Sequence, residues 1–232
     1  MSSILENLAA IKVRMAAACA RADRDPAGVK LIGVTKMVPI ERIREGVEAG
    51  LKSLGENYVQ EALEKIEALR EFQISWHFIG HLQSNKAKMV VEGFDLIHTA
   101  DRKSLAKELN RRARQQDKII PVLLQVNVGQ EETKSGTSSE EVGALFQYVS
   151  SLDALKVKGL MTLPPYLEDP EEVRPYFRQL RNLLDQLRQQ ASSPENLTEL
   201  SMGMSHDFEV AIEEGATLIR VGTALFGERP IP

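Results

Sequence analysis

The chain alternates between short apolar runs and longer amphipathic stretches. Eight runs rich in Val, Ile and Leu are short enough to be strands, and most are bounded by Gly, Pro, Asn or Asp. The stretches between them carry apolar residues every three or four positions, which is the spacing of a helix with one buried face. The predicted strands cover residues 30–36, 51–54, 74–80, 94–99, 119–128, 156–163, 198–203 and 217–222.

Several of the predicted helices have clear starts. Ser3 and Glu6 form a capping box ahead of the first apolar stripe, which predicts an extra helix before the first strand. Cys19 lies on that stripe, where a small buried side chain is a better interpretation than a reactive thiol. Asp169 followed by Pro170 marks the start of another helix, with a capping carboxylate and a proline in the first turn.

Eight strands, each followed by a helix or a helical turn, predict an α/β fold, namely a (β/α)8 TIM barrel with an extra N-terminal helix. A doubly wound open sheet is the alternative. It would usually carry a glycine-rich phosphate loop after its first strand, but the first strand here runs into Lys36 and Pro39 with no such motif. No Pro-, Gly- or Ser-rich linker interrupts the pattern, so one domain over residues 1–232 is expected.

The charge balance and cysteine content limit the partners and the compartment that can be expected for this protein. The 232 residues include 29 Lys and Arg against 33 Asp and Glu, for a net charge of −4. This balance argues against a nucleic acid or an anionic membrane as partner, since both attract concentrated positive charge. Cys19 is the only cysteine, which excludes an intrachain disulfide and fits a reducing compartment. No signal segment and no apolar run of roughly 20 residues are present, so a cytoplasmic protein is expected.

Unusual residues gather where the predicted strands end. In a TIM barrel these ends carry the functional groups. Lys36 ends the first strand; such a lysine is often only a solvated end residue. Inside a barrel mouth, however, desolvation favours the neutral amine, which can condense with an aldehyde. Lys36 is therefore a candidate anchor for an aldehyde cofactor.

A phosphorylated aldehyde also needs an anion site. Ser201, Gly203 and Ser205 follow the seventh predicted strand, and Gly222 and Thr223 follow the eighth. Glycine allows a close approach of the backbone, and hydroxyl and N–H groups can donate to a phosphate. The alternative interpretation is ordinary turn and capping chemistry.

Two further polar residues lie within predicted strands. Arg220 stands between Ile219 and Val221, so it is either an interior residue that needs a partner, such as a heteroaromatic nitrogen or a phosphate, or part of an ion pair on the outer face. His77 is either a core histidine with satisfied hydrogen bonds or a ligand contact. The histidines form no HxH or HExxH pair, so no metal site is expected.

Taken together, these motifs resemble the pyridoxal phosphate homeostasis protein family, which consists of single-domain relatives of the alanine racemase N-terminal barrel. The matching segments follow one another in order along nearly the whole chain. They are Val34-Thr35-Lys36 with Pro39, residues 55–61 (Gly55-Glu56-Asn57-Tyr58 and onward), residues 76–86 (Trp76-His77-Phe78-Ile79-Gly80 and onward), Gly159-Leu160-Met161, residues 200–207 (including Ser201-Met202-Gly203-Met204-Ser205), and Arg220-Val221-Gly222-Thr223 with Phe226-Gly227.

The resemblance implies a cofactor and a set of contacts for it. Pyridoxal 5′-phosphate would be held by Lys36 as an internal aldimine, with Arg220 facing the pyridine nitrogen. The remaining implied contacts fall into two groups, one for the phosphate and one near the rest of the cofactor. The phosphate group is Ser201, Gly222 and Thr223, and the second group is Asn57, His77 and Met204.

The same resemblance favours binding and protection of the cofactor over its use in catalysis. An arginine beside the pyridine nitrogen leaves that nitrogen unprotonated, which makes the ring a weak electron sink. The related racemases take a second base from a partner chain's additional β-domain, and this chain is expected to lack that domain because it ends at Pro232.

The leading hypothesis is therefore a non-enzymatic, monomeric protein of vitamin B6 homeostasis that could pass pyridoxal phosphate to apo-enzymes. One alternative is a pyridoxal-phosphate-dependent enzyme such as a weak amino-acid racemase. Another is a barrel that binds a different phosphorylated ligand without a Schiff base.

Overall fold

The computed structural model describes residues 3–131 and 134–228, and its eight parallel strands form a closed ring in chain order. The predicted TIM barrel is confirmed. Pro232 lies outside the described residues. The strands are β1 (Lys30–Val34), β2 (Ser53–Glu56), β3 (Ser75–Phe78), β4 (Leu96–Ala100), β5 (Ile120–Gln125), β6 (Leu155–Met161), β7 (Glu199–Ser201) and β8 (Leu218–Val221). Each overlaps one of the runs predicted from the sequence.

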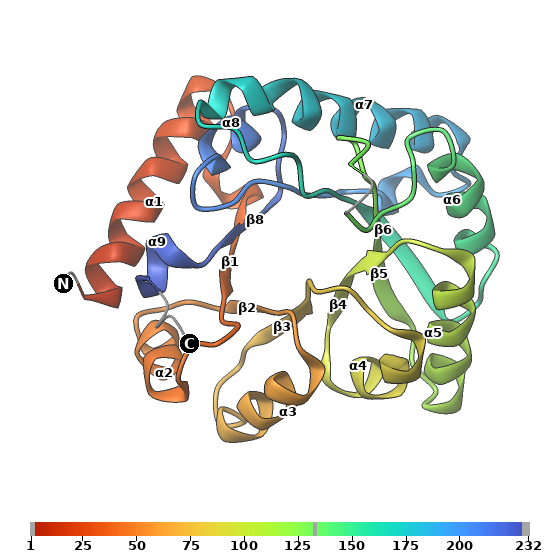
Figure 1. Cartoon of the computed structure of the whole chain (residues 1–232), viewed down its shortest axis with the longest axis horizontal. Coiled ribbons are helices and arrows are strands. Elements are labelled where there is room, and N and C mark those ends of the chain that lie inside the picture. The colour runs from red at the N-terminus through yellow and green to blue at the C-terminus, as the bar shows by residue number, and fades with distance from the viewer. Residues whose placement is uncertain (1–2, 132–133, 229–232) are drawn as a thin grey trace.

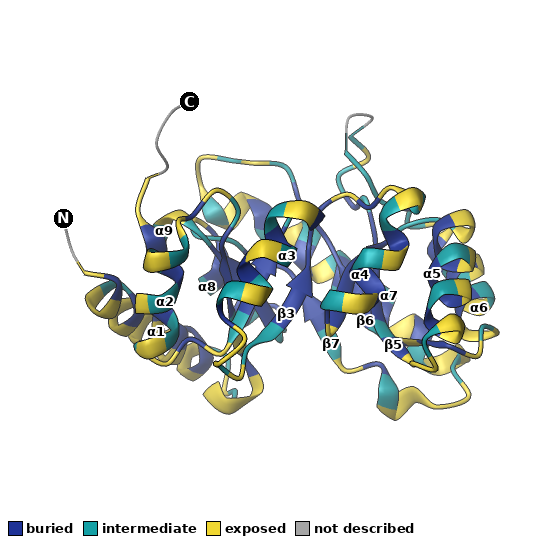
Figure 2. Cartoon of the chain, turned by 90° about the horizontal axis from the view of Figure 1, so that it is seen from below, coloured by how far each residue is buried: buried dark blue, intermediate teal, exposed yellow. Residues whose placement is uncertain are grey.

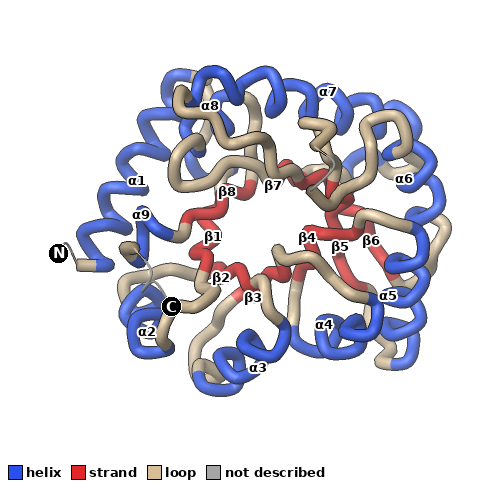
Figure 3. Tube along the Cα trace, viewed as in Figure 1, coloured by secondary structure: helices blue, strands red, loops and turns tan. Residues whose placement is uncertain are grey.

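The helices surround the ring of strands (Figures 1 and 3). The α-helices are α1 (Ile4–Arg21), α2 (Ile40–Glu48), α3 (Val59–Ala68), α4 (Ala87–Gly93), α5 (Lys103–Gln115), α6 (Val142–Ser150), α7 (Arg174–Gln190), α8 (Phe208–Glu213) and α9 (Thr223–Phe226). Short 3-10 helices are η1 (Pro26–Gly28), η2 (Ser84–Lys86), η3 (Pro170–Val173) and η4 (Pro194–Asn196). No helix in the described ranges is both long and apolar enough to cross a membrane.

The extra N-terminal helix is present as α1. It begins with the predicted capping box, in which Ser3 Oγ accepts from the Glu6 N–H and Glu6 Oε2 accepts from the Ser3 N–H. Its apolar stripe, Cys19 included, is buried. The helix packs beside α8 and α9, where Arg14 forms a bidentate ion pair with Glu209 (Figure 1). The first and last parts of the chain therefore lie together.

Hydrogen bonds between β1 and β8 close the barrel, with Lys30 opposite Leu218 and Gly33 opposite Val221. Alternate strand residues face inward, as the pleat of a strand requires. The others form the main core against the helices, and the strands are the most buried part of the molecule (Figure 2).

The inward-facing residues form two distinct groups. The apolar group is Ile32, Leu96, Leu123, Met161 and Leu218, and the polar group is His77, His98, Ser201 and Arg220. The polar group is the feature on which the functional site is built.

Candidate functional site

Lys36 lies just beyond the carboxyl end of β1, in a tight turn. The Val38 N–H donates to the Thr35 carbonyl over 3.0 Å, which makes Lys36 the second of four turn residues. Met37, the third, has φ 59°, a left-handed conformation that non-glycine residues seldom adopt. Lys36 itself is half-buried. The turn therefore sets a lysine at the carboxyl end of a barrel strand, where TIM-barrel sites form.

Arg220 is the buried cation of the site. It is only 3 % exposed, and its guanidinium donates to Ser201 Oγ and, over 2.8 Å, to the Thr162 carbonyl. Burial lowers the pKa of Arg220 to about 10, and the nearby Asp207 carboxylate offsets part of that effect. Arg220 is therefore charged at neutral pH.

Both of these partners of Arg220 are neutral groups, and within the described residues no carboxylate lies at ion-pair distance from its guanidinium. A buried charge in this position is stable only if further acceptors complete its hydrogen bonds. The arrangement suits an anionic or heteroaromatic ligand. Of the two alternatives for Arg220, the structure shows the interior position and excludes the ion pair on the outer face.

A chain of hydrogen bonds crosses the barrel interior from Arg220. Ser201 Oγ lies 2.8 Å from His98 Nδ1, His98 Nε2 lies 2.9 Å from His77 Nδ1, and His77 Nε2 lies 3.1 Å from Ser75 Oγ. Burial lowers the pKa of His77 to about 4, with a smaller contribution from the charge of Lys30. Burial also lowers the pKa of His98 well below its ordinary value, and the charges of His77 and Arg220 add to this effect. Both rings are therefore neutral at pH 7.

His77 is thereby placed away from Lys36. Its ring shares a hollow with Lys30, Ser53 and Ser75, residues from the amino-terminal ends of the strands. The structure thus links His77 to Arg220 only through His98 and Ser201, and the predicted contact of His77 with the cofactor stays a prediction.

The loops after β7 and β8 meet at Ser205. Its Oγ accepts from the Gly222 N–H over 3.3 Å and from the Ala224 N–H over 3.4 Å, both long for hydrogen bonds. Thr223, between these donors, is exposed. The two loops that were predicted to bind the phosphate therefore lie together, with Ser205 rather than Ser201 beside the backbone donors of the last loop, and phosphate binding there stays a prediction.

Gly203 makes the β7 loop possible. Its φ is +89°, and a Cβ there would lie 2.5 Å from the Ala211 Cβ. The turn brings the Gly203 carbonyl to the Arg220 N–H at 3.0 Å. Met204 is half-buried, and its N–H donates to Asp207 Oδ1 over 2.6 Å. The loop that holds Met204 is thus fixed against the strand that holds Arg220.

Asn57 follows β2 on the same end of the barrel. The Cβ of any larger residue at Gly80 would lie 2.2 Å from the Asn57 carbonyl oxygen, so the loops after β2 and β3 touch through their backbones. Asn57 Oδ1 is buried without a hydrogen-bond partner. An acceptor buried in that way normally has a donor, from water or a ligand. Asn57 therefore fits a ligand contact.

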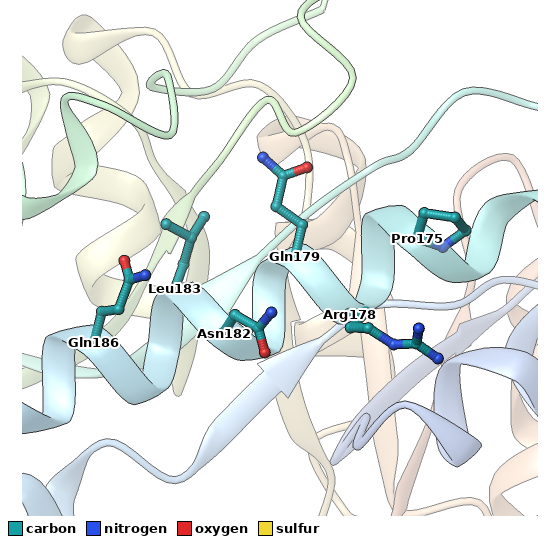
Figure 4. Close-up of a pocket in the computed structure, with 6 residues that line it drawn as sticks. All are labelled: Pro175, Arg178, Gln179, Asn182, Leu183 and Gln186. Carbon is teal, nitrogen blue, oxygen red and sulfur yellow. The ribbon is translucent and has the colours of Figure 1, made fainter.

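One surface hollow lies elsewhere and has a different character. Figure 4 shows it along α7, where its lining side chains, Leu183 and Arg178 among them, all come from one helix. Arg178 is engaged by Glu214 at 2.9 Å. No groups from different elements converge there, which distinguishes it from the barrel mouth.

Sequence reasoning assigned no role to two parts of this arrangement. His98 stands one alternation after the inward-facing Leu96, so counting inward positions along β4 would have found it. The buried lysine Lys65, which donates to the Thr35 carbonyl over 2.6 Å, sits on a helical face that reads as ordinary amphipathic surface.

The comparison with known proteins decides the family. The model of the alanine racemase N-terminal domain matches residues 7–230. The chain belongs to this family. A pyridoxal phosphate homeostasis protein of Aquifex aeolicus is 54% identical over 224 residues, which are 97% of this chain and 97% of that one. The family resemblance seen in the sequence is confirmed.

Solved structures of the family agree. PipY of Synechococcus elongatus, determined with PLP bound, is 38% identical, has a TM-score of 0.85, and aligns over 97% of this chain and all of its own. Alanine racemase of Streptomyces coelicolor is 20% identical with a TM-score of 0.71, and the alignment covers 96% of this chain and 59% of the racemase. At that identity the racemase shows the shared barrel fold alone.

Proposed function

We propose that this chain is a single pyridoxal-5′-phosphate-binding barrel domain that acts in vitamin B6 homeostasis without catalysis of its own. The Lys36 amine would hold the cofactor by condensing with its aldehyde, forming a C=N bond and releasing one water. The observation that carries the proposal is the presence of two residues in one barrel: Lys36 at the barrel mouth, and Arg220, a buried cation without an ion-paired carboxylate among the described residues. The names of its relatives support it.

The residues present fit such a group. Arg220 would face the pyridine nitrogen, because a guanidinium can only donate and that nitrogen accepts. Gly222 and Thr223, with Ser205 beside them, would hold the phosphate through N–H and hydroxyl groups. Asn57 and Met204 line the same end of the barrel. Ser201 stays in the set, and its bonds to Arg220 and His98 favour a role at the ring rather than at the phosphate.

When bound, pyridoxal phosphate supplies an electron sink for charge at a substrate carbon. The groups of this chain are arranged to keep that sink weak. Arg220 keeps its proton at neutral pH, so it cannot transfer one to the pyridine nitrogen without becoming a buried free base. His206 Nε2 donates to the carbonyls of Leu167 and Glu168, which engages its ring N–H in the loop after β6. These features fit a protein that binds and protects a reactive aldehyde better than they fit a racemase.

The experiment is an absorption spectrum of the purified protein, followed by borohydride reduction and peptide mapping. We expect a yellow protein with a pyridoxyl group on Lys36. A colourless protein that takes up no added pyridoxal phosphate, or one modified at a different lysine, contradicts the proposal. A cytoplasmic location, a monomeric state and delivery to apo-enzymes belong to the same proposal, and cell fractionation, sedimentation and reactivation of an apo-enzyme test them.

A further inference from the structure

A buried ion cluster lies behind the Lys36 turn, between β1, β2 and α3. The side chain of Lys65 is 5% exposed, and its ammonium is surrounded by acceptors. Nζ donates to the Thr35 carbonyl over 2.6 Å, to Glu56 Oε1 over 2.8 Å and to Glu61 Oε1 over 2.5 Å. Burying a lysine is costly even when it is paired, so a cluster of this kind indicates a specific task more than a gain in stability.

The cluster contacts the turn on both sides of Lys36. On one side, Lys65 binds the carbonyl of Thr35. On the other, Glu61 Oε1 accepts from the Met37 N–H over 2.6 Å. Thr35 and Met37 are the immediate neighbours of Lys36, and Lys65 and Glu61 are themselves joined one helical turn apart on α3. One ion pair therefore holds the peptide groups before and after Lys36.

The turn needs this support. Met37 has φ 59°, and a methionine pays a steric cost there that a glycine would not. Met37 is also 49% exposed, so packing of its side chain does little to hold the conformation. The bond from its N–H to a carboxylate is charge-assisted and among the strong ones. Without that bond, a relaxed turn would rotate the peptide planes that carry the Lys36 side chain.

We propose that Lys65 and Glu61 are positioning residues for Lys36: their ion pair fixes the Thr35–Val38 turn so that the amine is held at the barrel mouth. The inference rests on the proposed role of Lys36. Glu56 completes the cluster, since its Oε1 also accepts from Thr35 Oγ1 over 2.6 Å. Glu56 is fully buried and its Oε2 has no partner, so its charge depends on Lys65.

The choice of variant follows from these burials. Removing Lys65 would leave the Glu56 carboxylate buried and unpaired, which endangers the fold itself. Glu61 is 27% exposed, so Glu61→Ala removes the contact to Met37 with little risk of unfolding. Glu61→Gln keeps an oxygen that can accept from both Met37 and Lys65. Glu67→Ala is the matched control, because Glu67 lies on the same helix in an exposed ion pair with Arg70.

Two measurements test the proposal. In the cofactor-free protein, the pH profile of Lys36 acetylation by acetic anhydride is read by peptide mapping, with exposed Lys88 as internal reference. In parallel, the rate of imine formation with added pyridoxal phosphate is followed by absorbance. For Glu61→Ala we expect Lys36 acetylation to change relative to that of Lys88 and imine formation to slow by about tenfold, the loss of one charge-assisted hydrogen bond. Glu61→Gln should restore most of both, and Glu67→Ala should match wild type.

Unchanged Lys36 acetylation and imine rates in Glu61→Ala would overturn the positioning role. So would a Glu67→Ala variant as impaired as Glu61→Ala, which would indicate a general effect on α3. The acetylation arm needs no cofactor. A wild-type protein that takes up no pyridoxal phosphate while its Lys36 profile still depends on Glu61 would therefore refute the proposed function and leave the positioning role standing.

Discussion

His98 Nδ1 lies 2.8 Å from Ser201 Oγ, and this contact joins two buried imidazoles to the guanidinium of the site. Arg220 can only donate, so Ser201 Oγ accepts from it and retains one proton and one lone pair for other partners. A neutral imidazole has one donor and one acceptor nitrogen, so the chain through His98 and His77 to Ser75 runs in one direction or the other as a unit. Protonating either ring breaks that continuity.

Stability should therefore fall in mild acid. The pKa of His77 is about 4 in the folded protein against an ordinary value of 6.5, so the unfolded chain binds the proton first as the pH falls. The free energy of unfolding then decreases as pH drops from about 6.5 to 4, by about 3 kcal/mol from His77 alone. Urea unfolding at a series of pH values measures this slope.

Replacing the buried ring should flatten the slope. His77→Gln removes the titrating group, while His206→Gln, an exposed histidine, is the control. We expect the wild-type slope to persist in His206→Gln and to shrink between pH 6.5 and about 4 in His77→Gln. Equal slopes in all three proteins would mean that His77 is protonated as easily in the folded state as in the unfolded one.

Lys36→Ala should abolish covalent uptake of pyridoxal phosphate and leave the barrel folded. The side chain is half-buried at the rim, so its loss should change the free energy of unfolding by about 0.5 kcal/mol or less. Borohydride trapping and thermal melting measure the two effects. The control variant is Lys86→Ala, because Lys86 lies in the loop after β3. This variant should still be labelled at Lys36. An unfolded Lys36→Ala protein would contradict the rim placement.

Arg220→Met should weaken cofactor retention. Methionine fills much of the same space but donates nothing, which leaves Ser201 Oγ and the Thr162 carbonyl without the guanidinium. A hydrogen bond from a charged donor is worth about 1.5–3 kcal/mol, so the dissociation constant should rise roughly tenfold or more. Equilibrium dialysis measures it. An unchanged constant would show that Arg220 does not touch the cofactor.

The sequence predicted the barrel well because its signal is periodic and repeated. Lys36 follows a short apolar run, which predicted its place at the carboxyl end of the first strand; in the structure β1 ends at Val34 and Lys36 lies just beyond it. The chain of hydrogen bonds inside the barrel was harder to predict from the sequence. His98 acquires its role only because β4 faces β7 across the barrel, a distance of 103 residues along the chain. The hydrogen bond from Lys65 to the Thr35 carbonyl likewise depends on how α3 packs against the barrel, and the local spacing of residues does not predict it.

Proton exchange at amino-acid α-carbons separates custody from catalysis. Arg220, which keeps its own proton at neutral pH, is proposed to face the pyridine nitrogen and leave it unprotonated. The bound cofactor should then exchange the α-proton of alanine no faster than free pyridoxal phosphate at the same concentration. Proton NMR in heavy water follows the loss of that signal. Exchange well above the free-cofactor rate, and lost in Lys36→Ala, would favour the racemase alternative and reject a non-catalytic role.

Ser205 and Ser201 should affect different ends of the ligand. Ser205 Oγ lies beside the N–H groups of Gly222 and Ala224, whereas Ser201 Oγ is bonded to Arg220 and His98. Ser205→Ala should weaken binding of pyridoxal phosphate about fivefold, the value of one neutral hydrogen bond, and leave binding of unphosphorylated pyridoxal unchanged.

Ser201→Ala should instead weaken binding of both forms by a similar factor, because it disturbs the Arg220 guanidinium, which is proposed to face the ring they share. Binding constants for pyridoxal phosphate and pyridoxal, measured side by side for the two variants, give the comparison. If Ser201→Ala reduces only the phosphorylated form while Ser205→Ala reduces neither, then Ser201 is the phosphate contact. The hydroxyl would then have to leave the chain to His98 when the ligand binds.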